Sequence, residues 1–151
     1  SAIEAYQISK DICIEHGLSD QAFYTSGNLS GAYLDLREYE KALVEIEPLL
    51  DQMQEIDPYN RSTMLTRAAK VYYRNNNTQR ALELLQLVNE LEHPSIQIIK
   101  DIANSWMSRL YAVQENFSKA KEHRQLYNVH VHPQFKEETL WLINQVIPFL
   151  L

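Results

Sequence analysis

A pattern of apolar and small residues recurs three times in this chain, at a constant spacing of 39 positions. Each copy holds an apolar residue, a tyrosine, a residue at an expected turn and an alanine. The copies are Leu29, Tyr33, Tyr39 and Ala42; Ala68, Tyr72, Thr78 and Ala81; and Met107, Tyr111, Phe117 and Ala120. A fixed period of about 20 to 50 residues is typical of proteins that stack one helical unit on the next. The sequence therefore predicts an all-α array of helix pairs.

Turn and capping residues divide the chain into eight predicted helices. Gly17 lies at the usual position of a helix stop, and Ser19 is expected to cap the next helix. Asp57-Pro58 and His93-Pro94-Ser95 are typical helix starts, while Asn75-Asn76-Asn77 is typical of a turn. The predicted helices span 1–16, 19–36, 39–55, 58–74, 78–91, 94–113, 117–128 and 133–151.

Pro48 lies inside the third predicted helix. A proline in a helix interior removes one backbone hydrogen bond and clashes with the preceding turn. We expect a kink between Val44 and Glu47, and not a break, because apolar residues continue the stripe beyond Pro48.

The 151 residues are long enough to bury a sizeable core as one domain. We divide them into a half-repeat at 1–17, repeats at 19–56, 58–92 and 94–129, and a terminal helix at 133–151. Because the chain starts inside a repeat, we expect it to be a piece of a longer protein.

The two ends of such an array need covering. At one end, the missing partner of the first helix is expected to leave Ile3, Tyr6 or Ile8 partly uncovered, so we predict a possible homodimer through this end. The terminal helix can serve as a lid over the last pair, or as a self-association surface, or as a connection to a following domain. Its apolar stripe consists of Leu140, Ile143, Ile147 and Leu151.

Charge and composition narrow the class of partner. The net charge of −6 argues against a general nucleic-acid binder, because phosphate backbones demand a basic face. No apolar run reaches the roughly 18 to 20 residues that span a bilayer, so we predict no membrane contact by this segment. Cys13 is the only cysteine, which excludes an internal disulfide and a cysteine metal cluster. We interpret Cys13 as a small core residue.

Catalytic and metal-binding patterns are weak. His130-Val131-His132 places two histidines two positions apart without a thiolate or carboxylate at a defined spacing, so we interpret it as a linker. The acidic residues of 38–47 are interpreted as a solvated outer face. No arrangement of nucleophile and base, and no glycine-rich phosphate loop, stands out. We therefore predict a protein that is not an enzyme and holds no cofactor and no metal.

The repeated residues resemble those of the tetratricopeptide repeat family. Its motif has a small residue three or four positions before an aromatic, a second aromatic at the turn, and a small alanine opening the second helix. Matching residues are Leu29, Ser30, Tyr33, Tyr39 and Ala42; Ala68, Ala69, Tyr72 and Ala81; and Met107, Ser108, Tyr111, Phe117 and Ala120. The resemblance implies a right-handed superhelix of antiparallel helix pairs, an α-α solenoid.

Three departures qualify the resemblance. The period is 39 residues, where the family has about 34. Thr78 replaces the aromatic at the turn, and Arg124 lies where a large apolar residue is expected, as in an end repeat with one solvated face. Longer variants look similar to repeats in bacterial sensor and regulator proteins. This likeness suggests a sensory or regulatory segment of a larger signalling or transcription protein.

In this family the first helix of each pair lines a concave groove. Transferred to this chain, three of its positions, Arg67, Lys70 and Arg74, share one helical face. This set suggests a basic groove that accepts an acidic peptide or a carboxylate, although a solvated polar face is the alternative. The candidate partner-binding residues are Tyr24, Asn28, Asp35, Arg67, Lys70, Tyr73, Arg74, Trp106 and Arg109, with Thr63, Ile102 and Ser105 beside them.

Two functions follow from this groove. The preferred one is a non-catalytic scaffold that binds a protein or peptide, for which an acidic segment is the candidate partner. The alternative is a sensor in which the groove binds a metabolite or sugar and controls an attached output domain. A closed pocket around Arg67, Trp106 and Arg109 would favour the sensor, and an open groove would favour the scaffold.

Overall fold

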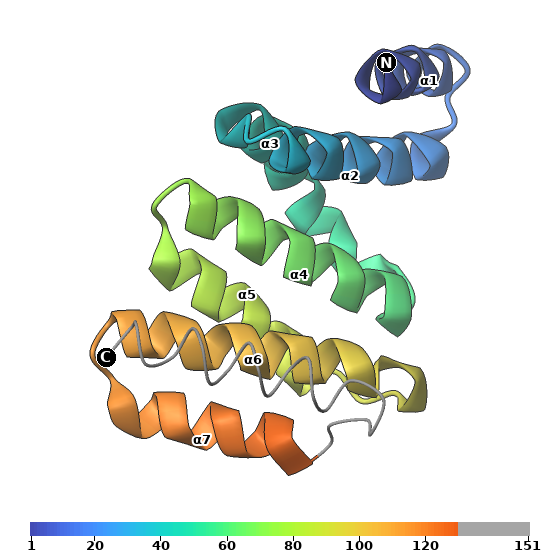
Figure 1. The fold of residues 1–151 in the computed structure, drawn as a ribbon. Helices are drawn as coiled ribbons and strands as arrows, with labels where there is room; N and C mark the ends of the chain where they lie inside the picture. The colour runs from blue at the N-terminus through green and yellow to red at the C-terminus, as the bar shows by residue number, and fades with distance from the viewer. Residues whose placement is uncertain (130–151) are drawn as a thin grey trace.

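The structure is a computed structural model that describes residues 1–129. These residues form helices joined by turns and contain no strand (Figure 1). The predicted helix 133–151 and the pair His130 and His132 lie outside the described residues. The α-helices are α1 (Ala2–Glu15), α2 (Ser19–Asp35), α3 (Tyr39–Ile46), α4 (Pro58–Arg74), α5 (Thr78–Glu90), α6 (Gln97–Val113) and α7 (Phe117–Val129). Two 3-10 helices, η1 (Glu47–Glu55) and η2 (Pro94–Ile96), lie between them.

The helix bounds follow the 39-residue period of the sequence. The first helices of the three pairs, α2, α4 and α6, begin at Ser19, Pro58 and Gln97, and each has 17 residues. The second helices, α3, α5 and α7, begin 39 residues apart as well. Helix α1 precedes α2 at nearly the place where a second helix would fall.

The turns within the pairs repeat the same backbone geometry. Arg37, Asn76 and Glu115 have φ of 61°, 63° and 58°, the left-handed conformation that ends many helices. Each turn is closed by a backbone hydrogen bond that spans six residues. In the first turn the amide of Glu38 donates to the Tyr33 carbonyl at 2.9 Å, and the amides of Asn77 and Asn116 form the equivalent bonds in the other two turns. The predicted stop at Gly17 is confirmed, with φ 67°.

The predicted caps are partly correct. The Asp57 carboxylate accepts from the amide of Asn60 at 3.0 Å, as a helix start requires. The prediction for Ser19 is wrong: Leu18 is the cap position of α2, and Ser19 is already its first helical residue. The tight turn at Gly17 brings the chain directly into the helix and leaves no extended residue for a serine cap.

The prediction of a continuous, kinked third helix is also wrong. The α-helix ends at Ile46, and the chain continues as the 3-10 helix η1 with Pro48 in its first turn. Pro48 has no N–H to donate to the carbonyl four residues earlier, so the α-helical pattern stops there. The apolar stripe nevertheless persists, because Leu49 and Met53 in η1 are buried.

Small residues let the two helices of a pair approach closely. Ala42 and Ala81 are completely buried, and Ala120 nearly so. The buried Ser30 hydroxyl donates to the Ala42 carbonyl at 2.8 Å, and Ser108 donates to Ala120 in the third pair at 2.9 Å. The core runs without interruption from α2 to α6. Cys13 is buried, as predicted.

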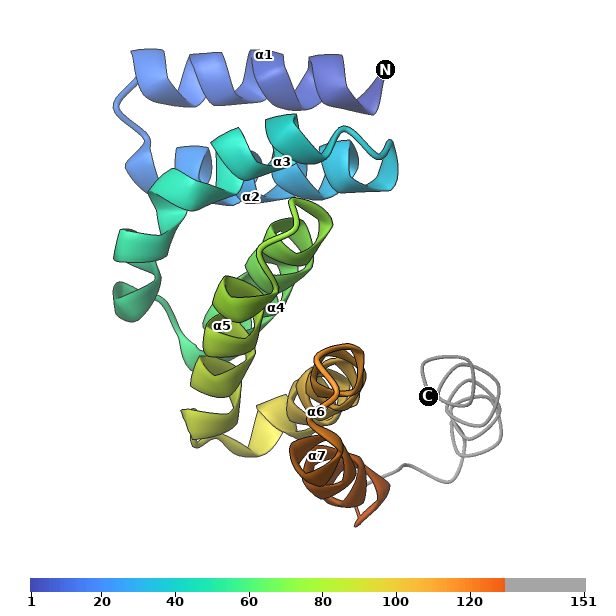
Figure 2. The same ribbon diagram turned by 90° about the vertical axis from the view of Figure 1, so that its left-hand side faces the viewer.

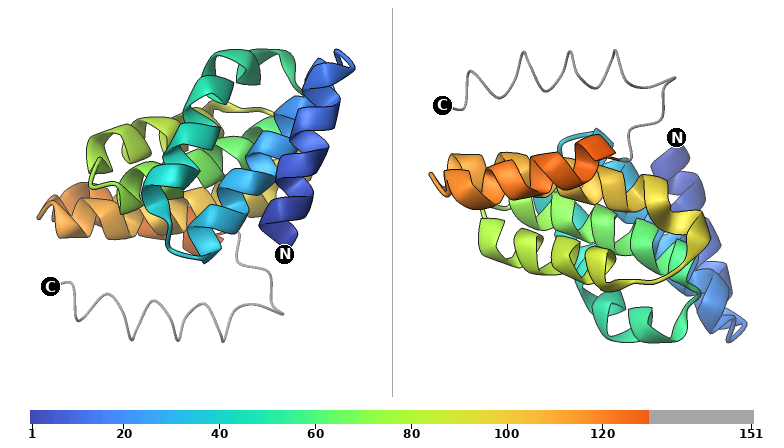
Figure 3. Two further views of the ribbon diagram at one scale, coloured as in Figure 1. Left: turned by 90° about the horizontal axis from the view of Figure 1, so that it is seen from above. Right: turned by 90° about the horizontal axis from the view of Figure 1, so that it is seen from below.

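Each helix packs against its neighbours in sequence, and α4 also contacts both α2 and α6. The pair α2–α3 lies towards one end of the stack and α6–α7 at the other (Figures 1 and 2). Seen from above and below, α2 crosses the direction of α6, so successive pairs are rotated relative to each other (Figure 3). Residues of the first helices α2, α4 and α6 line a common cleft.

Candidate functional site

The cleft that α2, α4 and α6 line has a volume of about 320 Å³, and we call it the α2–α4–α6 cleft. Three of the predicted groove residues, Asp35, Arg67 and Lys70, lie in its wall. The complete lining is Gly31, Leu34, Asp35, Thr63, Thr66, Arg67, Lys70, Ile99 and Ile102. The structure thus brings one acid and two bases from neighbouring helices to the same place.

Arg67 is committed in part to packing. Its Nη1 donates to the Gly27 carbonyl at 2.6 Å, which ties α4 to α2. The guanidinium can lie so close because Gly27 and Gly31 have no side chains: a Cβ on Gly31 would lie 3.2 Å from Arg67 Nε. Burial lowers the pKa of Arg67, while the charge of Asp35 acts to raise it.

Lys70 lies one turn further along α4 and is half-buried. Burial and, next, repulsion from Arg67 lower the pKa of its ammonium group, and Asp35 opposes them. No carboxylate within residues 1–129 forms a salt bridge with it. An anion placed against Lys70 would therefore relieve an unfavourable environment.

Aromatic rings and cations alternate beside the cleft. The Lys70 Nζ lies 5.6 Å from the centroid of the Trp106 ring, and the Arg109 guanidinium lies 6.0 Å from the same ring. Tyr73 meets Trp106 edge to face at 5.9 Å, and Arg74 lies 5.7 Å from the Tyr73 ring. Five predicted residues therefore form one connected group, which we call the cation–aromatic cluster.

Tyr24 and Asn28 lie apart from this group. Both are exposed on α2, about three and two turns before Asp35, respectively, and neither lines the cleft. Tyr24 packs edge to face on Phe23 with ring centroids 5.3 Å apart. These two residues extend the same helix face, but the structure gives them no contact with the basic residues.

The α2–α4–α6 cleft does not unite the three residues whose closed pocket would favour a groove sensor. Arg67 lines the α2–α4–α6 cleft, whereas Trp106 and Arg109 lie outside its lining.

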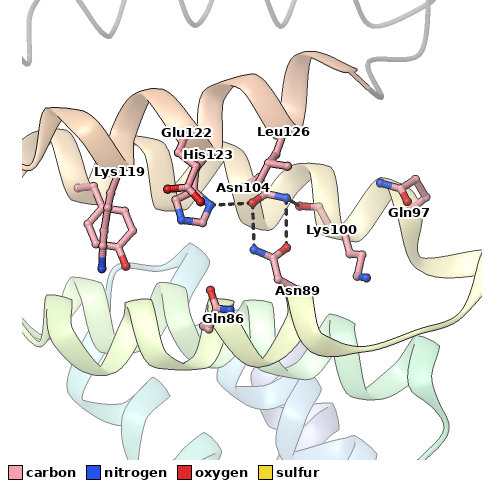
Figure 4. A pocket seen from close by; sticks show the side chains of 10 residues that line it. Gln86, Asn89, Gln97, Lys100, Asn104, Lys119, Glu122, His123 and Leu126 are labelled. Atoms are coloured by element: carbon pink, nitrogen blue, oxygen red, sulfur yellow. Dashed lines mark hydrogen bonds between the residues drawn. The ribbon is translucent and has the colours of Figure 1, made fainter.

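Sequence reasoning missed a larger pocket of about 600 Å³ between α5, α6 and α7, which we call the α5–α6–α7 pocket (Figure 4). The amides of Asn89 and Asn104 bond reciprocally at 2.9 and 3.1 Å. His123 Nδ1 lies 2.9 Å from Asn104 Oδ1, and burial lowers the pKa of the imidazole. The lining is Gln86, Asn89, Gln97, Lys100, Asn104, Tyr111, Lys119, Glu122, His123 and Leu126.

One signal in the sequence could have revealed this pocket. Asn104 and His123 stand 39 positions after Leu65 and Leu84, so two polar residues occupy places where the preceding pair has buried leucines. The departures identified in the sequence were Thr78 and Arg124, and neither residue lines the pocket.

Further findings concern the helices and side chains of residues 1–129. No helix there is both long and apolar enough to cross a bilayer, and no group of three or more potential ligands there could hold a metal ion. On α1 and the following turn, Ile8, Ile12, Ile14 and Leu18 are exposed. A homodimer through this end stays a prediction.

Comparison with known proteins gave no match: no family model, no curated protein and no solved structure resembles this chain closely enough to be reported.

Proposed function

We propose that this chain is a tetratricopeptide-like scaffold whose helix pairs stack as a right-handed superhelix and bind a protein segment on the face of α2, α4 and α6. The first helices α2, α4 and α6 begin 39 residues apart and have the same length, which supports a repeated unit. The equivalent bonds from Ser30 and Ser108 support a common packing geometry within the pairs. A scaffold of this kind uses its first helices as an extended binding surface.

The observation that carries the proposal is the cation–aromatic cluster beside the cleft. Lys70 and Arg109 approach one Trp106 ring, and Arg74 approaches Tyr73. Aromatic and arginine side chains dominate the binding energy of many protein interfaces. A complementary segment would carry carboxylates for the cations and an apolar side chain for the exposed edge of the cleft at Ile102.

The wider role that we propose is regulatory. The scaffold would be a sensory or regulatory segment of a larger signalling or transcription protein, without catalytic activity of its own and without direct contact to nucleic acid or membrane. A small-ligand sensor is the second candidate function, and the observation that favours it is the α5–α6–α7 pocket.

The proposal is tested with a random twelve-residue peptide library displayed on phage. We expect the wild-type chain to enrich sequences rich in Asp and Glu with at least one large apolar residue. For a synthetic peptide selected in this way, the double variant Lys70→Glu and Arg109→Glu should lower the affinity at least about tenfold in low salt. Binding by the wild type should weaken as NaCl is added, and binding by the variant should weaken less.

The matched control is Lys41→Glu with Lys121→Glu, which changes the net charge equally on the exposed surfaces of α3 and α7. We expect it to bind the peptide like the wild type at moderate salt. Arg67 is left intact because its bond to Gly27 supports the fold. Selection of neutral or basic peptides, or equal affinity in the two double variants, would contradict the basic-face proposal.

A further inference from the structure

The interior of the third helix pair differs in chemistry from that of the second. Leu65 and Leu84 are 3% and 1% exposed in the second pair, and their equivalents Asn104 and His123 are 7% each. Asn89, near the end of α5 in the second pair, is half-buried and bonds to Asn104 across the interface between the two pairs. These three polar residues are in contact with one another, so the change is concentrated at one site (Figure 4).

Hydrogen bonds make this polar cluster tolerable in the interior. A buried amide or imidazole that is left without a partner destabilises the fold, because it loses its hydrogen bonds to water without replacement. Here the amides of Asn89 and Asn104 satisfy each other, and Asn104 Nδ2 also donates to the Lys100 carbonyl at 3.0 Å. The cluster is therefore a preformed arrangement that keeps fixed orientations.

The same bonds determine the tautomer of His123. The Lys100 carbonyl can only accept, so the atom of Asn104 that faces it is the NH₂ group. The Asn104 atom that faces His123 is then the oxygen, and Nδ1 of the ring must donate to it. In the neutral imidazole this leaves Nε2 as an acceptor, and the hydrogen bond that the ring forms within residues 1–129 is the one from Nδ1.

The charged residues around the pocket indicate which kind of ligand could donate to His123 Nε2. Lys119 stands one turn before His123 on α7, and its Nζ lies 5.2 Å from the centroid of the Tyr111 ring. Tyr111 in turn stacks on His123 at 5.4 Å, with 14° between the ring planes. Lys100 lies towards the other end of the pocket, and Glu122 is the single carboxylate of the lining (Figure 4). The pocket thus combines the ammonium group of Lys119, and that of Lys100, which lies 3.8 Å from the Glu92 carboxylate, with a fixed acceptor and several amides.

We propose that the α5–α6–α7 pocket binds a small hydroxylated carboxylic acid, with the carboxylate at Lys119 and a neighbouring hydroxyl donating to His123 Nε2. The amide of Gln86 bonds a further hydroxyl of the ligand. A volume of about 600 Å³ is in the range of pockets that hold such molecules. This site is separate from the proposed peptide-binding face, since Ile99 and Ile102 of α6 face the cleft and Lys100 and Asn104 face the pocket.

The experiment uses D-glucuronate as the probe, with D-glucose as its uncharged counterpart and acetate as a carboxylate without hydroxyls. The ¹⁵N shifts of the His123 ring are followed by NMR during each titration. We expect a saturable shift of Nε2 with D-glucuronate, and an affinity at least about tenfold lower for D-glucose and acetate. Lys70→Glu with Arg109→Glu should leave this titration unchanged, which separates the pocket from the peptide-binding face.

His123→Leu is the decisive variant because it restores the residue type of the preceding pair. With glucuronate binding followed through backbone amide shifts, it should fold at least as well as the wild type at pH 7 and lose at least about tenfold in affinity. His16→Leu, which changes an exposed histidine at the end of α1, should bind normally. The proposal is overturned if no saturable shift occurs up to about 50 mM D-glucuronate, if acetate binds equally well, or if His123→Leu retains the affinity.

Discussion

Arg67 and Lys70 illustrate how two similar residues on one helix face take different roles. The guanidinium of Arg67 reaches the Gly27 carbonyl and holds α4 against α2. Lys70, one turn further on, has no carboxylate partner among the described residues and borders the Trp106 ring. The sequence alone did not distinguish Arg67 from Lys70, since both were candidates for binding an anion. The contact with α2 makes Lys70 the better residue for testing a partner.

At the same scale, the protonation of His123 should affect stability. Burial lowers its pKa, with Lys119 lowering it further and Glu122 opposing the shift, whereas an unfolded histidine titrates near about 6.5. The unfolded state therefore binds a proton first, and the free energy of unfolding should fall as the pH drops through about 6.5. The slope is at most about 1.4 kcal/mol per pH unit, and it ends below the pKa of the folded state.

The measurement is urea unfolding of the wild type and His123→Leu at about pH 7.5 and pH 5.5. The free energy of the wild type relative to the variant should decrease on acidification. Lys100, Lys119 and Glu122 are present in both proteins, so their own titration largely cancels in this comparison. A relative stability that is constant or that increases at the lower pH would contradict the burial of a neutral ring.

At the level of the elements, the three left-handed turns offer a test of backbone strain. Arg37, Asn76 and Glu115 adopt a conformation that glycine enters without penalty, and only asparagine among these three residues tolerates it well. Glu115→Gly should raise the free energy of unfolding by about 0.5–1 kcal/mol. Gln125→Gly, at an exposed position inside α7, should lower it by about 1 kcal/mol. Thermal unfolding followed by circular dichroism compares the two, and equal losses would show that the turn is unstrained.

The elements also show which features a sequence can reveal. Local chemistry predicted the turn at Asn75–Asn77 and the start at Pro58, because these residues act on the backbone beside them. The end of α3 at Ile46 was missed, since the apolar stripe continued past Pro48 while the hydrogen-bond pattern changed. The link from Arg67 to Gly27 joins residues 40 positions apart and depends on how two helices pack, which no local rule supplies.

For the whole molecule, α6 places the two candidate sites on opposite sides of one helix. Ile99 and Ile102 contribute to the α2–α4–α6 cleft, while Lys100 and Asn104 contribute to the α5–α6–α7 pocket. A ligand in the pocket would bond α5 to α7, and a peptide in the cleft would bridge α2, α4 and α6. Both would restrain the same helix, so binding at one site is able to change the affinity of the other without any contact between the ligands.

The contacts between elements also predict how the molecule unfolds. Packing is local along the stack, since α4 is the element that joins the first helices of the two outer pairs. Leu29 in α2 and Met107 in α6 occupy equivalent positions of the repeat, and each is 1% exposed. Truncation of either residue to alanine should cost about 2–5 kcal/mol, mostly at its own end of the stack.

Native-state hydrogen exchange, measured by mass spectrometry, shows which helices lose stability in each variant. Leu29→Ala should reduce amide protection chiefly in α1, α2 and α3, and Met107→Ala chiefly in α5, α6 and α7. The two substitutions serve as controls for each other, because they remove similar buried volume from the same place in two copies of one unit. An identical, uniform loss of protection in both variants would mean that the described helices unfold as one cooperative unit, in which a ligand at either end stabilises every helix equally.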